Sequence, residues 1–486
     1  MARKPFLPLL ESAAGMPLNR RTVVGGLAML AGGILTSCGA QSAGAATKRR
    51  GRVLMDQGKG TPVGLASALE FPLIEALLGR RARRFSMGAE IPDGPLQYKS
   101  DKEPMPLNEL EQMMVLAAAT GNTGYHYMIT RHAKYQPHIS NYSMAAGGRT
   151  FPSSAGFHTS NFFYTDDNGI YYLPTRDAPD LKQADEDNNV DLKGWLDRHK
   201  SRIKKIQDKR LFLPAEEPYL EGHNTWSVNR PGSTLLIPVA DVAQHMIAMV
   251  AFLVQNGYCI FDDVHNEKIK GLQKFSKLVN VDSPYPLTFV EQYALAEVCA
   301  ELSTSCYAGM LMLQAMGLGG WMFDGVDRFS MLGASGNPEV PALGFRFDTN
   351  NRWSTPNPTG LEGVFEATCP PHYANMRAAV DVMIERKYGP GGPFNAETPG
   401  PWKESGRVRG SAMVHSEEFK DCVAVQCQYI FDKFGKFPGT VPSLMILMYL
   451  QAHHLDLGFY DKYFKPGAYL QTQADHMKNW HEGHDH

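Results

Sequence analysis

Residues 288–328 read TFVEQYALAEVCAELSTSCYAGMLMLQAMGLGGWMFDGVDR. No proline interrupts the part from 288 to 316, which is rich in alanine, leucine and methionine, three residues that favour helix. Its glutamates lie in the N-terminal half, where the helix dipole favours negative charge: Glu291, Glu297 and Glu301. The stretch therefore predicts one helix over residues 288–316, about 43 Å long at about 1.5 Å per residue.

The end of this predicted helix admits two interpretations. After Tyr307 the residues are apolar nearly all round, which predicts burial, and the glutamates argue against a membrane span. Gly317 stands where a left-handed C-terminal cap belongs, and Gly319 and Gly320 follow it. A buried helix that ends in glycines can bring backbone amides close to a flat ligand. A core helix with an ordinary glycine stop has the same sequence, so both interpretations stay open here.

The composition is that of an ordinary globular protein. The chain has 486 residues, 43% of them hydrophobic, and a formal net charge of -2. Proteins that bind nucleic acids usually carry an excess of positive charge, which this near-neutral chain lacks, so we expect no nucleic-acid partner. The seven cysteines include no Cys-x-x-Cys pair and are too few for a disulfide scaffold, which predicts buried thiols.

The first 45 residues predict an export signal. Arg20 and Arg21 precede an apolar, glycine-rich run over 23–35, and this arrangement resembles a twin-arginine signal. The apolar run is short for a membrane span. We therefore expect an exported protein of the periplasm or cell envelope.

A possible lipid attachment site follows the apolar run. Leu35-Thr36-Ser37-Cys38 resembles a lipobox, which predicts cleavage before Cys38 and a lipid anchor on its sulfur. Cleavage among the small residues 43–45 is the alternative. Residues 46–68 are rich in glycine, alanine, lysine and arginine and predict a tether, with order beginning near Leu69.

A cluster of arginines follows a short amphipathic helix predicted over 70–79. Residues 80–84 read RRARR, four arginines in five positions. Such a run is usually a solvated charged surface. The functional alternative is a clamp for a phosphate or a flavin, because guanidinium groups make two-pronged hydrogen bonds to phosphate oxygens.

The middle of the chain gives the clearest local signals. Asn108 caps a helix predicted to run to Ala119, and His126, His132 and His138 follow without a metal-binding spacing. The later elements are a loop of small residues (148–156), a β-hairpin with strands 160–164 and 170–173, a surface helical excursion (177–208), a helix (239–254), strands (259–262 and 342–347), a surface-wrapping segment (350–410), and helices (417–434 and 443–455).

The C-terminal tail carries four histidines: His476, His481, His484 and His486. They could bind a metal, but a disordered polar tail is the more ordinary interpretation, so we predict no metal site.

The order of these pieces resembles the nitroreductase superfamily. An arginine cluster before Phe85, a Pro-Ser-Ser-Ala-Gly loop leading into a hairpin, and a long helix ending in Gly-Leu-Gly occur in that order. The turn at Gly169-Ile-Tyr171-Tyr172 is similar to the branch of azoline-forming dehydrogenases. The resemblance covers roughly residues 70–175 and 235–350. Its members are flavoproteins that usually hold FMN at the interface of a homodimer.

The resemblance implies an α+β fold, with a mixed or antiparallel central sheet flanked by helices and a helical C-terminal extension. The domains would be an export signal (1–45), a tether (46–68), a nitroreductase-like domain (69–355) with an insertion (about 177–230), and the extension (356–486).

The resemblance also implies which residues bind FMN. The arginine cluster would contact the flavin phosphate or ring through Arg80, Arg81 and Arg83. The serine loop, residues 152–156, would lie against the flavin through Pro152, Ser153 and Ser154. The backbone approaching the ring would come from the glycine segment, which comprises Gly317, Leu318, Gly319 and Gly320, and from Gly325. Arg352 would be a late phosphate-binding residue. No catalytic side chain is assigned.

Three features depart from the family pattern. The first motif has Gly79 and Arg81 where the family commonly has arginine and serine, no asparagine equivalent follows Ser154, and the insertion and extension lie outside the usual fold. The resemblance as a whole implies an FMN-dependent oxidoreductase that transfers hydride to or from a flat, electron-poor or heterocyclic molecule. The alternative is a non-enzymatic envelope protein that keeps the fold and binds a ligand or partner.

Overall fold

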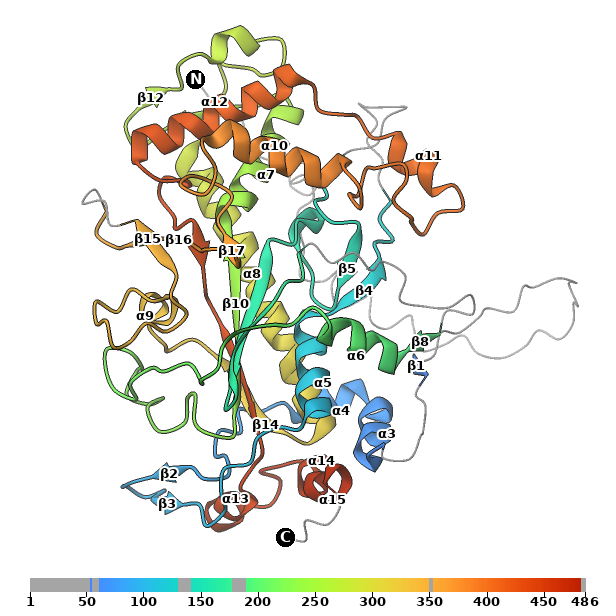
Figure 1. Cartoon of the computed structure of the whole chain (residues 1–486), viewed down its shortest axis with the longest axis vertical. Coiled ribbons are helices and arrows are strands. Elements are labelled where there is room, and N and C mark those ends of the chain that lie inside the picture. Colours follow the sequence, from blue (N-terminus) through green and yellow to red (C-terminus); the bar gives the residue numbers. More distant parts are fainter. Residues whose placement is uncertain (1–52, 55–60, 130–140, 177–188, 349–352, 482–486) are drawn as a thin grey trace, which may run out of the picture. The chain divides into compact units, whose positions relative to one another are not determined.

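The computed structural model describes residues 53–54, 61–129, 141–176, 189–348 and 353–481 (Figure 1). The predicted signal, Cys38 and Arg352 lie outside these residues. Within them, no helix combines the length and the apolar composition that crossing a bilayer requires.

Helix α8 (Leu287–Met316) is the longest element and confirms the first prediction. Its 30 residues span about 45 Å. Gly317 ends it in the left-handed conformation, with φ at 78°. Figure 1 shows α7 (Val242–Gln255), α10 (Met376–Tyr388) and α12 (Glu417–Phe434) at one end of α8, and the C-terminal helices at the other.

Helix α5 (Glu109–Thr120) packs closely on α8, because small residues line the contact. Asn108 caps it, as predicted. A Cβ at Gly309 of α8 would lie 3.0 Å from the Cβ of Ala119, and the Ser305 hydroxyl donates to the Ala119 carbonyl at 2.9 Å. Bulkier residues here would separate the two helices.

The central sheet has seven strands, and every pairing within it is antiparallel. Its order is β14-β19-β10-β6-β7-β9, with β18 also paired to β10. The strands are β6 (Ser160–Asp166), β7 (Gly169–Leu173), β9 (Lys204–Gln207), β10 (Thr234–Asp241), β14 (Gly319–Phe323), β18 (Leu444–Met445) and β19 (Tyr449–His453). The β6–β7 hairpin confirms its prediction, and helices with antiparallel strands make the chain α+β.

The remaining elements surround this sheet and α8. Small sheets contain β1 (Val53–Leu54) with β8 (Val190–Asp191), β2 (Glu90–Ile91) with β3 (Tyr98–Lys99), β4 (Asn122–Tyr125) with β5 (Gly147–Arg149), β11 (Ile260–Asp262) with β12 (Glu267–Lys268) and β13 (Tyr285–Pro286), and β15 (Arg346–Asp348) with β16 (Asn357–Leu361) and β17 (Phe365–Glu366). The other helices are α3 (Val63–Glu70), α4 (Leu73–Gly79), α6 (Leu192–Lys200), α9 (Arg328–Leu332), α11 (Ser405–Gly410), α13 (Leu457–Tyr463), α14 (Gln471–Ala474) and α15 (His476–Trp480).

The largest error in prediction concerns residues 443–455, which do not form a helix. They contain β18 and β19, and β19 lies inside the central sheet between β14 and β10. Every residue of β19 is buried, Gln451 and His453 included, and the apolar run over 444–450 fits a core helix as well as a buried strand. The predicted extension therefore supplies an inner strand of the central sheet.

Smaller corrections follow from burial and from turns. The helix predicted from Val239 begins at Val242, because the preceding residues continue β10. The strand predicted over 342–347 is confined to β15, and the wrapping segment contains the half-buried helix α10. The predicted tether ends earlier, because α3 begins at Val63. The predicted surface excursion contains β9, a strand of the central sheet.

We predict that Gly317 is required by packing as well as by backbone conformation. A Cβ at Gly317 would lie 2.0 Å from the Thr472 carbonyl oxygen, whereas Gly336, with a similar φ of +75°, has nothing within 4 Å. Gly336→Ala should lower the free energy of unfolding by about 1 kcal/mol, the cost of a left-handed alanine. Gly317→Ala should cost roughly 1–3 kcal/mol more, through overpacking. Denaturant unfolding measures both, and equal losses would contradict the assigned contact.

Candidate functional site

The serine loop is fastened to the middle of α8. The Ser153 hydroxyl donates to Glu301 Oε2 at 2.5 Å, and the Ser154 hydroxyl donates to the Glu297 carboxylate. Glu301 Oε1 accepts the backbone N–H of Ser160 at 2.8 Å. Because Glu301 is buried, these donors replace the water that its carboxylate loses. The loop is thereby held at one position along the helix axis.

Two histidines that sequence analysis did not select lie beside the serine loop. His158 is 3% exposed, and both its ring nitrogens lack a hydrogen-bond partner among the described residues. The His126 ring lies 5.5 Å from it, between centroids, and His126 Nε2 is also unpartnered there. Burial, with nearby Arg149 and His126, lowers the pKa of His158 well below its usual value, so the ring is neutral. Unpaired buried nitrogens are suited to receive a polar group.

Arg80 and Arg81 lie at the surface near α8. The Arg80 guanidinium carbon is 6.0 Å from the centroid of the Tyr307 ring, and its Nη1 is 3.9 Å from the sulfur of Met310. Arg81 is exposed, and its Nη1 donates to the carbonyls of Leu78 at 3.0 Å and Arg80 at 2.7 Å. Both guanidinium groups retain N–H donors that could form hydrogen bonds with a phosphate group.

Arg83 is a buried structural residue. Its guanidinium donates to Gln314 Oε1 at 2.9 Å and to the carbonyls of Gly79 at 3.1 Å and Ala468 at 2.9 Å. Its own carbonyl accepts the Gly320 N–H at 2.9 Å. The arginine cluster is therefore bonded directly to the glycine segment, but the Arg83 side chain serves protein acceptors.

Arg84 belongs to the arginine run but was not among the residues predicted to bind FMN, and it lies beside the glycine segment. Its guanidinium carbon is 5.0 Å from the Trp226 ring centroid and 4.9 Å from that of Trp321 in β14. Its Nη2 donates to Asn224 Oδ1 at 2.8 Å and to the Ser227 hydroxyl at 2.6 Å. These contacts join Arg84 to residues 223–227 and to β14.

The glycine segment is covered by protein. Gly317, Leu318, Gly319 and Gly320 are all buried. Gly319 and Gly320 pair with β19, and the Gln473 side chain donates to the Leu318 carbonyl at 3.1 Å. Gly325 has its carbonyl bonded to the Glu221 N–H at 3.2 Å. The backbone predicted to approach a flavin ring is thus occupied by β19 and by the C-terminal segment.

The predicted residues are distributed along α8 rather than gathered at one point. The serine loop contacts Glu297 and Glu301, Arg80 contacts the region of Tyr307, and the glycine segment begins at Gly317. At about 1.5 Å per residue, Tyr307 is about 15 Å from Glu297 along the axis, and Gly317 is about 24 Å from Glu301. Arg83 and Gly320 meet, while the serine loop lies apart from both.

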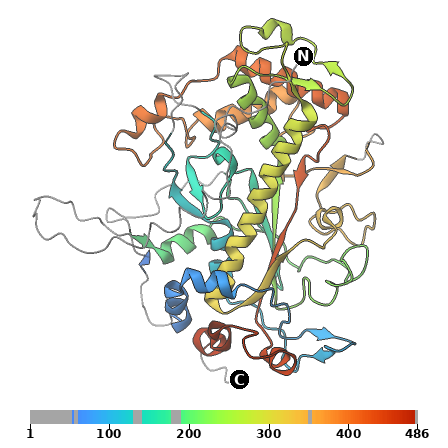
Figure 2. The same ribbon diagram turned by 180° about the vertical axis from the view of Figure 1, so that it is seen from behind.

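A partly exposed face of α8 connects the serine loop to Arg80. Thr304, Tyr307, Ala308 and Leu311 on this face are only half-buried. Figure 2 shows α8, in yellow, running along the near side of the ribbon. This strip, which we call the α8 face (residues 304–311), is the place where the predicted loop and the predicted arginines border common accessible surface.

Helix α4 adds an exposed apolar patch next to Arg80. Leu73, Ile74, Leu77 and Leu78 are 66%, 60%, 41% and 70% exposed. Four large apolar side chains exposed on one helix are characteristic of an interaction surface. The patch precedes the arginine cluster directly in sequence.

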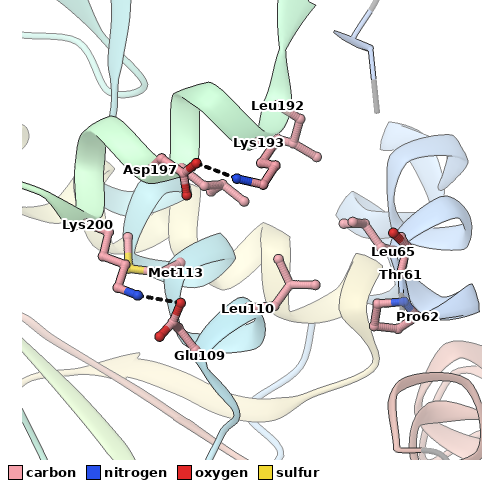
Figure 3. A pocket seen from close by; sticks show the side chains of 11 residues that line it. Thr61, Pro62, Leu65, Glu109, Leu110, Met113, Leu192, Lys193, Asp197 and Lys200 are labelled. Carbon is pink, nitrogen blue, oxygen red and sulfur yellow. Dashed lines mark hydrogen bonds and ion pairs between the residues drawn. The ribbon is translucent and has the colours of Figure 1, made fainter. Parts of the chain in front are cut away.

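A separate apolar pocket of about 240 Å³ lies between α3, α5 and α6 (Figure 3). Leucines and a methionine line it, and its charged residues pair with one another, Lys200 with Glu109 at 2.6 Å and Lys193 with Asp197 at 2.7 Å. None of the residues predicted to bind FMN lines this pocket. Its lining suits an apolar group and supplies no redox chemistry.

Comparison with known proteins adds two distant similarities. No family model matches the sequence, and no curated protein matches it. A "putative nitroreductase" from Ralstonia eutropha JMP134 is similar over 63% of this chain and 90% of its own, with 12% identity and a TM-score of 0.25. CLA-ER, an enone reductase of gut-bacterial fatty acid saturation, is similar over 56% of this chain and 86% of its own, with 14% identity and a TM-score of 0.21. Scores this low carry no argument about fold or function.

A buried lysine lies away from these residues, on α10. Lys387 Nζ is 3.5 Å from His415 Nε2, and the His415 ring stacks on Phe419 at 3.9 Å between centroids. Burial lowers the pKa of Lys387 to about 7 and holds that of His415 well below its usual value. The surrounding core therefore favours the uncharged amine.

We predict that Lys387 makes stability rise with pH. Its pKa is about 7 in the folded chain and about 10.4 when unfolded, so between these values the unfolded state binds more protons. The free energy of unfolding should increase across that window, by up to about 1.4 kcal/mol per pH unit from this group. Lys387→Met should remove this part of the rise, and Lys403→Met, at an exposed position, should leave it. Denaturant unfolding from pH 6 to 10 tests this, and parallel curves for the wild type and Lys387→Met would contradict it.

Proposed function

We propose that this chain is an exported FMN-dependent oxidoreductase that transfers hydride to or from a flat, electron-poor or heterocyclic small molecule. The order of the arginine, serine-loop and glycine motifs supports this function. The observation that carries it is the α8 face, a partly exposed strip bounded by the serine loop at one end and by Arg80 at the other. The protein would reach the periplasm or cell envelope through its twin-arginine signal, with a lipid on Cys38 as an anchor.

The residues around the α8 face fit the parts of FMN. Arg80 and Arg81 offer guanidinium donors for the phosphate, and the serine loop lies toward the other end of the face. Tyr307, beneath the Arg80 guanidinium, adds an aromatic surface. FMN would supply the hydride chemistry, while these side chains would bind and orient it.

A second copy of the chain is part of the proposal. The strip is open on one side, and the apolar patch of α4 adjoins its Arg80 end. A homodimer that buries Leu73, Ile74 and Leu78 would cover both the patch and the flavin. Burying these side chains removes apolar surface from water at about 25 cal/mol per Å², which favours association.

One observation favours the alternative, a non-enzymatic envelope protein that binds a ligand or partner. The glycine segment is buried beneath β19 and the C-terminal segment, and the guanidinium of Arg83 is committed to three protein acceptors. The backbone at Gly319 and Gly320 is therefore not free to stabilise a reduced ring, because it pairs with β19 and the Gly320 N–H donates to the Arg83 carbonyl.

FMN titration tests the flavin proposal. The mature protein should bind one FMN per chain, and Arg80→Ala should weaken binding at least about tenfold, since a charge-assisted phosphate contact contributes about 1.5–3 kcal/mol. Arg407→Ala removes an exposed guanidinium elsewhere and should leave the affinity unchanged. Quenching of flavin fluorescence measures all three. A folded protein that takes up no FMN would reject the enzyme and favour the alternative, and equal affinities for the wild type and Arg80→Ala would place the flavin elsewhere.

Sedimentation tests the dimer. Leu78→Glu introduces a charge at the most exposed residue of the apolar patch and should convert the dimer to a monomer at micromolar concentration. Leu96→Glu makes the same change at a position that is 41% exposed outside the patch and should not. A monomeric wild type, or equal sedimentation of the two variants, would contradict the proposed interface.

A further inference from the structure

Four potential metal-binding side chains converge from distant parts of the chain. Glu111 comes from the first turn of α5, His454 follows β19, His476 begins α15, and His481 follows it. Their ligand atoms all lie within 4.8 Å of one another. The four side chains are 0%, 1%, 4% and 8% exposed, respectively, so the group is enclosed. We call it the histidine cluster.

The Nε2 atoms of the three imidazoles all lie close to the same carboxylate oxygen of Glu111. Glu111 Oε1 lies 3.3 Å from Nε2 of His454, 3.0 Å from Nε2 of His476 and 2.8 Å from Nε2 of His481. The other carboxylate oxygen, Oε2, accepts the N–H of Asn108 at 2.7 Å, which fixes the orientation of the carboxylate.

Hydrogen bonds made by Nδ1 of His454 and His476 determine whether their Nε2 atoms, which face the centre of the cluster, carry a proton. His454 Nδ1 is 2.9 Å from the carbonyl oxygen of Met105, and His476 Nδ1 is 2.8 Å from that of Met316. A carbonyl oxygen can only accept, so Nδ1 carries the proton in both rings. In the neutral imidazoles, each Nε2 then directs a lone pair at the oxygen of Glu111. Nδ1–H bonded to a carbonyl is the arrangement usual for histidines that bind metals.

This arrangement requires positive charge at its centre. Lone pairs of two imidazoles and a carboxylate would otherwise repel one another in an enclosed site. Protons alone are a poor solution, because the ring centroids are 5.1–5.6 Å apart and several imidazolium ions there would repel each other without water. One divalent cation satisfies all four groups together.

We propose that Glu111, His454, His476 and His481 bind one divalent transition-metal ion, and that Zn²⁺ matches the donor set best. Three imidazole nitrogens and one carboxylate oxygen are donors that zinc accepts in a tetrahedral site. Ligand atoms about 2.0–2.1 Å from zinc lie about 3.3 Å apart in a tetrahedron. The separations of 2.8–3.3 Å between Oε1 and the three nitrogens are near this value.

The site is structural because protein groups fill all four positions. An enclosed zinc with four protein ligands has no position for a substrate. It ties the last helices to α5 and β19, and the same segment covers the glycine segment through Thr472 and Gln473. The ion would thereby stabilise the cover over Gly317 and Leu318.

Metal binding by untagged, full-length mature protein tests the proposal. Protein stripped with a chelator should take up one Zn²⁺ per chain in a titration against a competing chelator. Its Co²⁺ form should show the visible absorption of a tetrahedral ion. His481→Gln removes the ligand nearest the surface and should weaken Zn²⁺ binding at least about tenfold, while a chain ending at Glu482, which lacks the last two histidines, should bind as the wild type does.

The outcomes separate the cluster from adventitious chelation by the tail. Stoichiometric uptake that is lost in His481→Gln and kept in the shortened chain supports the site. No uptake by the wild type, equal affinity in His481→Gln, or loss on shortening overturns it. If His481→Gln folds poorly, measurements on the wild-type protein test the proposal. Its Co²⁺ form must show the absorption spectrum of a tetrahedral ion, and EDTA must lower its melting temperature; failure of either overturns the site.

Discussion

Buried carboxylates on α8 must find hydrogen-bond donors, and this requirement organises the structure around the helix. An uncompensated buried charge costs several kcal/mol. Glu291 is met by the backbone N–H groups of Gly439 and Thr440 at 2.6 Å each, and Glu301 by Ser153 and Ser160. Each glutamate therefore attaches a separate segment at a fixed position along the axis.

The C-terminal half of α8 uses amide and backbone groups in the same way. Gln314 accepts from the buried guanidinium of Arg83, and its carbonyl accepts the Thr472 hydroxyl at 2.8 Å. The arginine cluster, β14 and the last helices are thus joined at one end of α8. The serine loop is held near its middle, which leaves the α8 face between them accessible.

Local patterns were sufficient to predict the elements whose signals lie within a few residues. The cap at Asn108, the glycine stop at Gly317 and the β6–β7 hairpin are such cases. Residues 443–455 could not be assigned by pattern, since their apolar run over 444–450 fits a core helix as well as a buried strand. Only pairing with β10 and β14 decides between them, and that pairing is a property of the fold.

The candidate sites were harder to predict, for the same reason. The histidine cluster joins Glu111 to His454 and to two residues of a tail expected to be disordered, and no spacing links them. Arg83, predicted to contact a flavin, lies beside the glycine segment, and its guanidinium donates to three protein acceptors. His126 and His158 come from separate segments that the fold brings together, so a single sequence offers no signal for them.

Hydrogen–deuterium exchange with and without FMN tests most directly whether the α8 face is the ligand-binding surface. The account predicts that FMN slows exchange in residues 152–158 and 304–311 and leaves the glycine segment unchanged, since Gly317 and Leu318 are already covered. Protection confined to residues 317–323, or no change in the serine loop and the α8 face, would contradict it.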